Sequence, residues 1–170
     1  MTVQGLERLN RQLRALAPSV VEAMRPSLDA EAGGMAQAIA RAAPDQRLAA
    51  SVGHGAQAPN GPSGAVRSGG SERSQALASF GLHQEVWAGS HEAFWARWSE
   101  FGTAPHEIAP KNRKVLAFNT ASGRAFATSV QHPGERAQPF FYPTIRARKR
   151  LTKARLVRAG SRAAKAMAAK

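Results

Sequence analysis

The C-terminal part of the chain leaves the fewest folding options open. After Pro143 no further proline occurs, and alanine, arginine, lysine and leucine dominate to the end of the 170-residue sequence. These are strong helix formers, so the sequence predicts one long, very basic helix from about residue 143, weakened only at Gly160-Ser161. Its apolar residues can share one face: Ile145, Leu156, Ala159, Ala163 and Met167.

Positive charge is concentrated in the same part of the chain. Residues 1–110 contain nine Lys/Arg and ten Asp/Glu, whereas residues 111–170 contain fifteen Lys/Arg and one acidic residue, Glu135. This asymmetry underlies the net charge of +13 and indicates an acidic partner, either nucleic acid or an acidic protein surface. The alternative is a solvated tail that only keeps the protein soluble.

The first 43 residues have helical periodicity. Pro18 predicts a break, and a second helix is expected over residues 20–43, with a kink or short interruption at Pro26 or Gly33-Gly34. Before the break, apolar residues recur at steps of three and four, as one face of an amphipathic helix requires: Leu6, Leu9, Leu13, Leu16 and Val20.

The middle of the chain changes character twice. Residues 52–75 contain six glycines, two prolines and four serines, and predict either a flexible loop or an arm that becomes ordered on a neighbouring subunit. Strands are expected at 78–87, 115–118 and 125–130, the last two joined by a turn at 120–123, with a helical turn or two at 92–100.

The predicted fold class is therefore α+β, with N-terminal helices, a small antiparallel sheet and a long basic C-terminal helix. Large apolar residues are sparse and aromatics make up only 6% of the chain, so the core should be small and neighbouring subunits should contribute to stability. We expect one domain over residues 1–150, including the loop 52–75, and a basic helical extension over residues 151–170.

The sequence contains no recognisable catalytic or cofactor-binding motif. There is no cysteine, no phosphate-binding loop, no G-x-S-x-G element and no cluster of carboxylates in the basic third. The histidines lack the spacing of a metal site: His54, His83, His91, His106 and His132. We therefore predict a protein that is not an enzyme and binds no metal or cofactor.

Neither secretion nor membrane insertion is predicted. Charged residues interrupt the leucines of residues 1–17, so no apolar core of a signal peptide is present. No apolar run approaches the roughly 18–20 residues of a membrane span. The protein should be made and folded in the cytoplasm of its host.

The basic helix is the candidate for electrostatic contacts. Its side chains would surround the helix rather than form one stripe, which favours charge complementarity over sequence-specific reading. The candidate contacts to DNA or an acidic protein are Arg146, Arg148, Lys149, Arg150, Lys153, Arg155, Arg158 and Arg162.

Several short segments, taken in order, resemble one protein family. The most distinctive is the aromatic-rich stretch 95–103, which ends in Glu-Phe-Gly-Thr; it is followed by His-Glu-Ile-Ala-Pro-Lys at 106–111 and Gln-Pro-Phe-Phe-Tyr-Pro at 138–143. Residues 40–52, 115–118 and 130–134 also match in the expected places. This order is similar to that of the tail-completion, or neck, proteins of long-tailed bacteriophages. Asp45-Gln46-Arg47 departs from the family's Thr-Gly, and the loop 52–75 and the basic tail are longer.

The resemblance implies a structural virion protein at the head–tail junction. It implies a ring, which we expect to contain six copies, between neighbouring neck and tail proteins such as a connector or stopper and a tail terminator. The loop 52–75 and the basic helix are the expected inter-ring contacts. The alternative is a nonspecific DNA-binding protein that uses the basic helix, and genomic DNA is a possible partner in both cases.

The family-motif residues have physically plausible tasks. We expect Phe101 to be a buried aromatic beside a tight turn at Gly102, which permits positive φ, and Thr103 to bond the turn. Pro143 is suited to a first helical position. The complete set expected to shape the fold and its assembly is Glu100, Phe101, Gly102, Thr103, Pro139, Phe140 and Pro143.

Overall fold

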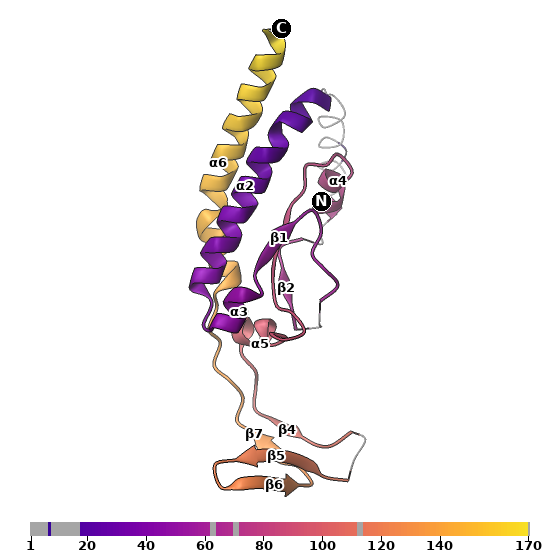
Figure 1. The fold of residues 1–170 in the computed structure, drawn as a ribbon, viewed down its shortest axis with the longest axis vertical. Coiled ribbons are helices and arrows are strands. Elements are labelled where there is room, and N and C mark those ends of the chain that lie inside the picture. Colours follow the sequence, from indigo (N-terminus) through magenta and orange to yellow (C-terminus); the bar gives the residue numbers. More distant parts are fainter. Residues whose placement is uncertain (1–6, 8–17, 62–63, 70–71, 112–113, 170) are drawn as a thin grey trace.

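The computed structural model describes Glu7 and residues 18–61, 64–69, 72–111 and 114–169. The predicted first helix, with Leu6, Leu9, Leu13 and Leu16, lies outside the described residues. The α+β class is confirmed (Figure 1). In chain order the elements are α2 (Pro18–Ala42), α3 (Gln46–Ala50), β1 (Gly53–Gly55), β2 (Val66–Arg67), α4 (Glu72–Ala78), β3 (Glu85–Ala88), α5 (Ala96–Phe101), β4 (His106–Ile108), β5 (Leu116–Thr120), β6 (Gly123–Ala127), β7 (Val130–His132) and α6 (Phe141–Ala168).

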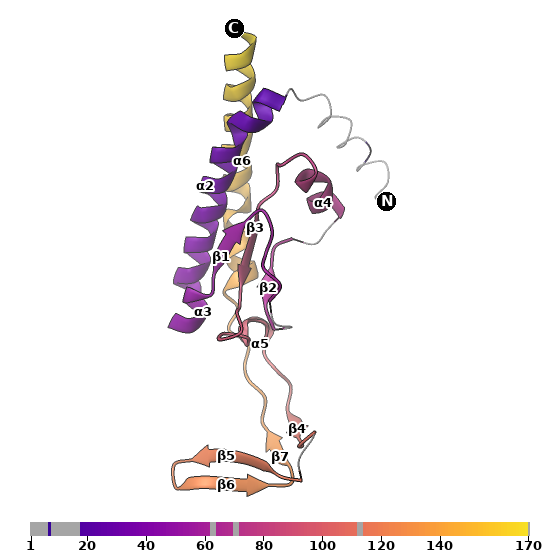
Figure 2. The same ribbon diagram turned by 45° about the vertical axis from the view of Figure 1, so that its right-hand side comes forward.

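Two long antiparallel helices, α2 and α6, lie side by side along one face of the body (Figures 1 and 2). Against them packs a three-stranded antiparallel sheet in the order β1-β3-β2. Gly53 pairs with Trp87 across β1 and β3, and the indole ring lies within 2.7 Å of where a Cβ of residue 53 would be. The absence of a Cβ at Gly53 therefore leaves room for the Trp87 indole ring against β1.

The core is small, as expected from the scarcity of large apolar residues. Its largest fully buried side chains are Phe140, Phe141, Ile39 and Leu48. Alanines fill much of the remaining space, so helices and sheet approach closely. The other buried members of the cluster are Ala32, Met35, Ala36, Val66, Val86, Ala88, Ala93 and Ala96.

Helix α2 is one uninterrupted helix, so the predicted short interruption is wrong, whereas the predicted kink at Pro26 or Gly33-Gly34 stays a prediction. It begins at Pro18, where a missing N–H costs no hydrogen bond, and it runs through Pro26 and the glycine pair. The glycines serve close packing: a Cβ at Gly33 would lie 3.3 Å from His54 Nε2, and one at Gly34 would lie 3.4 Å from an Arg148 guanidinium nitrogen.

Residues 52–75 differ from the predicted loop or partner-ordered arm. They contribute β1 and β2, which pair with β3 of the same chain, and they lead into α4. The strand predicted at 78–87 is correspondingly shorter, because α4 occupies residues 72–78 and a turn with Gly81 at φ +67° precedes β3. Polar contacts add to the burial of Ala58 and Val66 in holding residues 52–75 to the sheet.

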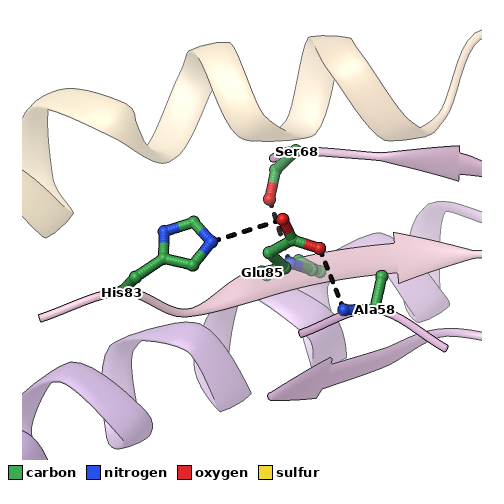
Figure 3. A network of polar contacts seen from close by, with 5 residues as sticks. Ala58, Ser68, His83 and Glu85 are labelled. Atoms are coloured by element: carbon green, nitrogen blue, oxygen red, sulfur yellow. Dashed lines mark hydrogen bonds and ion pairs between the residues drawn. The ribbon is translucent and has the colours of Figure 1, made fainter. Parts of the chain in front are cut away.

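That polar network centres on Glu85 (Figure 3). Its carboxylate accepts hydrogen bonds from the Ala58 N–H at 2.9 Å and from His83 Nε2 at 3.3 Å, while the Val86 N–H donates to Ser68 Oγ at 2.9 Å. Burial acts to raise the pKa of Glu85, but the Ala58 hydrogen bond and the His83 hydrogen bond and charge outweigh it and leave the pKa below the ordinary 4.5. The carboxylate therefore ties residues 58 and 83 to the sheet.

Residues 102–139 form an arm that extends away from the body (Figures 1 and 2). Its near part is the antiparallel pair β4–β7, and its far part is the hairpin β5–β6. The predicted hairpin turn is confirmed, since Thr120 pairs with Gly123. Two-stranded ribbons such as these have little core of their own.

The long C-terminal helix is also confirmed. It begins at Phe141, two residues before Pro143, and continues through Gly160 to Ala168. Gly160 allows contact with α2, since a Cβ there would lie 3.3 Å from the Met24 sulfur. No break marks the expected domain boundary at residues 150–151, because the same helix crosses it. Among the described residues, no helix combines the length and apolar character needed to cross a membrane.

Candidate assembly site at the root and tip of the arm

Glu100 is the residue that joins the two main motifs. Its side chain is on α5 and the residue is only 3% exposed. One carboxylate oxygen accepts the N–H groups of Phe140 and Phe141, both at 2.8 Å, and the other accepts the Tyr142 N–H at 3.0 Å. The carboxylate therefore caps the N-terminus of α6 from 40 residues away in sequence.

The first turn of α6 requires hydrogen-bond acceptors from outside the helix. The first N–H groups of a helix have no partner within the helix, and its N-terminus carries partial positive charge that favours an anion. The residues that lead into α6, Gln138-Pro139-Phe140, include no serine, threonine, aspartate or asparagine that could cap it. Glu100 supplies both the acceptors and the negative charge.

Gly102 turns the chain from α5 into the arm. Its φ is +72°, and its N–H donates to the Trp98 carbonyl at 2.7 Å. A Cβ here would lie 2.7 Å from the Glu135 carbonyl oxygen and 2.8 Å from the Ala137 nitrogen, so both the conformation and the space require glycine. The expected positive φ at Gly102 is confirmed.

Backbone hydrogen bonds join the outgoing and returning strands at this point. Thr103 and Glu135 exchange two bonds, of 2.9 and 3.1 Å, and the Gln138 N–H donates to the Ser99 carbonyl at 2.7 Å. Gly134, at φ +83°, lies against the Thr103 carbonyl oxygen. Together with Glu100 and Gly102 these contacts form what we call the root clamp, which fixes where the arm leaves the body.

The motif residues are therefore brought together, with changed roles. Phe101 was expected to be buried but is 60% exposed, while Glu100 beside it is buried. The buried aromatic next to the turn is instead Phe140, together with Phe141. Thr103 contributes through its backbone, and Pro143 is the third rather than the first residue of α6, a position that still needs no N–H.

Three large aromatic side chains are exposed at the end of the body from which the arm leaves. Phe94, Trp98 and Phe101 are between 41% and 60% exposed, and we call them the body patch. Phe94 meets Trp98 edge to face, with ring centroids 5.4 Å apart, and Phe101 lies 5.8 Å from the ring of Tyr142. These contacts hold the rings in place without covering them.

Asp45 connects this region to α3. It caps α3 by accepting the Leu48 N–H at 2.8 Å, and it accepts the Trp95 indole N–H at 3.1 Å. Burial acts to raise the pKa of Asp45, but these two hydrogen bonds, a third from the Arg47 backbone N–H and the positive charge of the Arg47 guanidinium outweigh it and lower the pKa. The carboxylate therefore stays negative next to the aromatic cluster.

Exposed apolar side chains also lie on the arm. Ile108, Val115, Phe118 and Phe126 are between 38% and 63% exposed, and the register of β5 and β6 places Phe118 on the opposite face of the hairpin from Phe126. The Arg124 guanidinium lies over the Phe126 ring, 5.6 Å from its centroid. Lys111 and Arg124 also line a shallow hollow with Phe126. The arm therefore presents apolar groups among positive charges.

Two histidines that the sequence analysis treated separately meet near the root of the arm. His106 and His132 are register partners across β4 and β7, with ring centroids 5.1 Å apart. His106 Nδ1 lies 2.9 Å from the Ala104 carbonyl oxygen, and the Gly134 N–H donates to His132 Nδ1 at 3.1 Å. Among the described residues no group of three His, Asp or Glu could hold a metal ion. Both histidines bond to backbone atoms of the arm, as residues with a structural role do.

The candidate electrostatic contacts on α6 do not form one surface. Arg155 is paired with Glu31 of α2 at 3.2 Å, and Arg148 is half-buried against Gly34, with its Nε buried. Lys149 and Lys153 line an apolar groove between α2 and α6. The remaining members are exposed: Arg146, Arg150, Arg158 and Arg162.

Sequence reasoning missed the capping role of Glu100, the body patch and the exposed apolar side chains of the arm. A signal existed for the first: a helix start without a local cap, and an acidic residue in the accompanying motif. The arm had no comparable signal, because strand alternation does not tell whether a strand pair packs on the body.

Comparison with protein-family models, with curated proteins and with solved structures gives no match.

Proposed function

We propose that this chain is a structural, non-enzymatic virion protein of a long-tailed bacteriophage or prophage, and that it assembles as a ring at the head–tail junction. The observation that carries the proposal is the arm. It extends from the body on a fixed root, has little core of its own, and exposes large apolar side chains that a monomer leaves in water. We expect another subunit to pack against such a segment and cover its exposed apolar side chains.

Two further observations support the head–tail assignment. The motifs that carry the resemblance, Glu-Phe-Gly-Thr and Gln-Pro-Phe, meet in space through Glu100 and the start of α6, so the two segments form one structural unit. A ring around the tail axis also suits a subunit with different surfaces on its body and arm. A contact between unlike surfaces of neighbouring subunits is heterologous, and repeated heterologous contacts can close into a ring. Its neighbours would be other neck and tail proteins.

The test is electron microscopy of lysates from a phage whose coding sequence for this chain is deleted. Filled heads beside separate, complete tails support the proposal, and wild-type protein supplied from a plasmid should restore joined particles. Normal joined virions without the protein would refute it. An accumulation of unfilled heads would also contradict it, because it would place the defect at DNA packaging.

Nonspecific DNA binding is the second candidate. Helix α6 carries nine Lys/Arg and no acidic residue, and most of these side chains are exposed. Affinity for duplex DNA should then fall steeply with salt, by about a factor of ten or more between roughly 50 and 200 mM. A ring held by apolar contacts should survive the same change, so one salt series on free protein and protein with DNA separates the two functions.

A further inference from the structure

Helix α6 presents a basic face on the side that α2 does not cover. In Figure 1 it forms one edge of the body, and α2 packs along its inner side. Within the described part of the chain, Arg155 is the one cation of α6 in an ion pair, with Glu31 of α2. The other acidic residues of α2, Glu22 and Asp29, are paired with residues outside α6. The outer side of α6 therefore keeps its positive charge.

The exposed cations on this side fall into two groups with the same spacing. Within each group the steps are four and three residues, which keep its members on one side of a helix. The second group repeats the first twelve residues later, a distance that advances a helix by about 18 Å and turns it by about 120°. The first group is Arg146, Arg150 and Lys153, and the second is Arg158, Arg162 and Lys165, all exposed.

Small side chains separate the two groups. Ala147, Ala154 and Ser161 recur at steps of seven residues, close to two full turns, so they form a line along the helix. The line runs on the side opposite Ala159 and Ala163, which are buried. At about 100° per residue, the first basic group lies on one side of the line and the second group lies on the other. The face is therefore low in the middle and has cations on both flanks.

This arrangement matches the major groove of duplex DNA. The groove is about 12 Å wide and admits an α-helix, and the phosphates of the two strands line its two walls. Small residues at the front of the helix allow it to enter, while the flanking cations can reach phosphates of both strands. An acidic protein surface on one side of the helix would leave one flank unused, and the major groove of double-stranded RNA is too narrow for side chains to read.

Two exposed apolar side chains on α6 favour the same ligand. Leu151 is 47% exposed and Val157 is 60% exposed, and they lie on opposite sides of the line of small residues. In the major groove, the methyl groups of thymine offer apolar contacts. A partner that supplies only negative charge would leave both side chains in water.

We propose that this face of α6 enters the major groove of duplex DNA and contacts the phosphates of both strands without reading the sequence. Ala147 and Ala154, at the front of the helix, have no side-chain group that could hydrogen-bond a base edge. The inference rests on the DNA binding given above as the second candidate function, and it names the groove and the contact residues. In a ring at the head–tail junction, the same face would meet the genome as it passes.

The first test removes one cation from each flank of the full chain. Fluorescence anisotropy with a short labelled duplex of mixed sequence measures affinity over a salt series. Arg150→Gln and Arg158→Gln should each make the slope of log affinity against log salt less steep by about one. Arg136→Gln, at an exposed position on the arm, is the matched control and should leave the slope unchanged. A flank variant with the wild-type slope overturns the proposal.

The second test changes shape and keeps every charge. Ala154→Trp adds bulk in the middle of the line of small residues, so affinity for the duplex should fall by at least about tenfold. Ala147→Trp, at an exposed position, repeats the test if circular dichroism shows that the first variant unfolds. Wild-type affinity in a folded variant overturns the proposal, because cations that bind phosphates from outside the groove would not be affected by the added ring.

Modified DNA gives an independent answer with the wild-type chain. Glucosylated hydroxymethyl groups at C5 of cytosine fill the major groove, because C5 of a pyrimidine points into it, and they should weaken binding by at least about tenfold relative to plain duplex. Equal affinity for the two duplexes overturns the proposal. Polyglutamate that competes as well as duplex DNA at equal charge also overturns it, in favour of an acidic protein partner.

Failure of this inference is distinguishable from failure of the proposed functions. DNA binding that is insensitive to both the tryptophan variants and the glucosylated duplex refutes the groove contact alone. Absence of DNA binding at low salt refutes the second candidate function as well. The head–tail role is tested separately, by the particles that accumulate in the deletion.

Discussion

Replacing Glu100 with alanine removes three hydrogen bonds at once from the start of α6. The N–H groups of Phe140, Phe141 and Tyr142 then lose their acceptor, and the first two are buried. Water cannot replace the carboxylate fully, because Glu100 itself is 3% exposed. We expect the free energy of unfolding to fall substantially and α6 to fray at its first turn.

The size of the effect follows from the groups left behind. A buried donor without a partner costs about 1–3 kcal/mol, so the two buried N–H groups of Phe140 and Phe141 together cost about 2–6 kcal/mol. We take about 4 kcal/mol for Glu100→Ala, against a total stability of about 5–15 kcal/mol. For a chain of this size each kcal/mol lowers Tm by about 2–4 °C, so Tm should fall by about 8–16 °C.

Glu100→Gln separates the charge from the acceptor. Glutamine keeps one carbonyl oxygen but places an NH₂ group among N–H donors, so we expect about half of the alanine effect. Urea unfolding measures both variants through the fluorescence of the three tryptophans, of which Trp95 precedes α5 and Trp98 lies on it. Glu92→Gln, an exposed carboxyl on the same segment, is the matched control and should change stability by less than about 0.5 kcal/mol. A loss below about 1 kcal/mol for Glu100→Ala would refute the capping argument.

Three other substitutions test the rest of the fold. Gly102→Ala should destabilise by about 2–4 kcal/mol, because φ is +72° and the Glu135 carbonyl oxygen occupies the space of a Cβ; chemical denaturation measures it. Asp45→Ala removes the cap of α3 and should cost about 1 kcal/mol, and an unchanged Tm would contradict that role. The lowered pKa of Glu85 means that its contribution to stability is present above the ordinary 4.5 and is lost as pH falls through the lower folded value. Glu85→Gln should therefore flatten the acid side of the Tm-against-pH curve below about pH 5, and a curve parallel to that of wild type would count against the network.

Local patterns in the sequence predicted the local elements of the fold. The proline-free basic stretch correctly predicted α6, because helix propensity depends on neighbouring residues in the sequence. The turn residues at 120–123 correctly predicted the β5–β6 hairpin. Residues 52–75 were misjudged because composition alone cannot show that β3 and Glu85 provide hydrogen-bond partners for a glycine-rich segment.

Tertiary contacts decided the details of the site. Hydrophobicity alone predicts that Phe101 is buried and Glu100 exposed. In the structure Glu100 is buried and Phe101 is exposed. The start of α6 needs an anion, and α5 places that anion where Phe101 cannot also point inward. The sequence thus marked which residues belong to the site, while the pairing of residue 100 with residues 140–142 fixed what they do.

One consequence of this arrangement is that the root clamp serves the body and the arm together. Glu100 ties the returning chain to α5, and Gly102 with the Thr103–Glu135 pair ties the outgoing chain to the returning one. An apolar contact at this point would hold the helices but would not set the direction of the strands, because apolar packing is not directional. Hydrogen bonds and a glycine turn are directional. An arm that leaves the body in a fixed direction needs that property, and this gives a physical reason for a buried carboxylate where the arm begins.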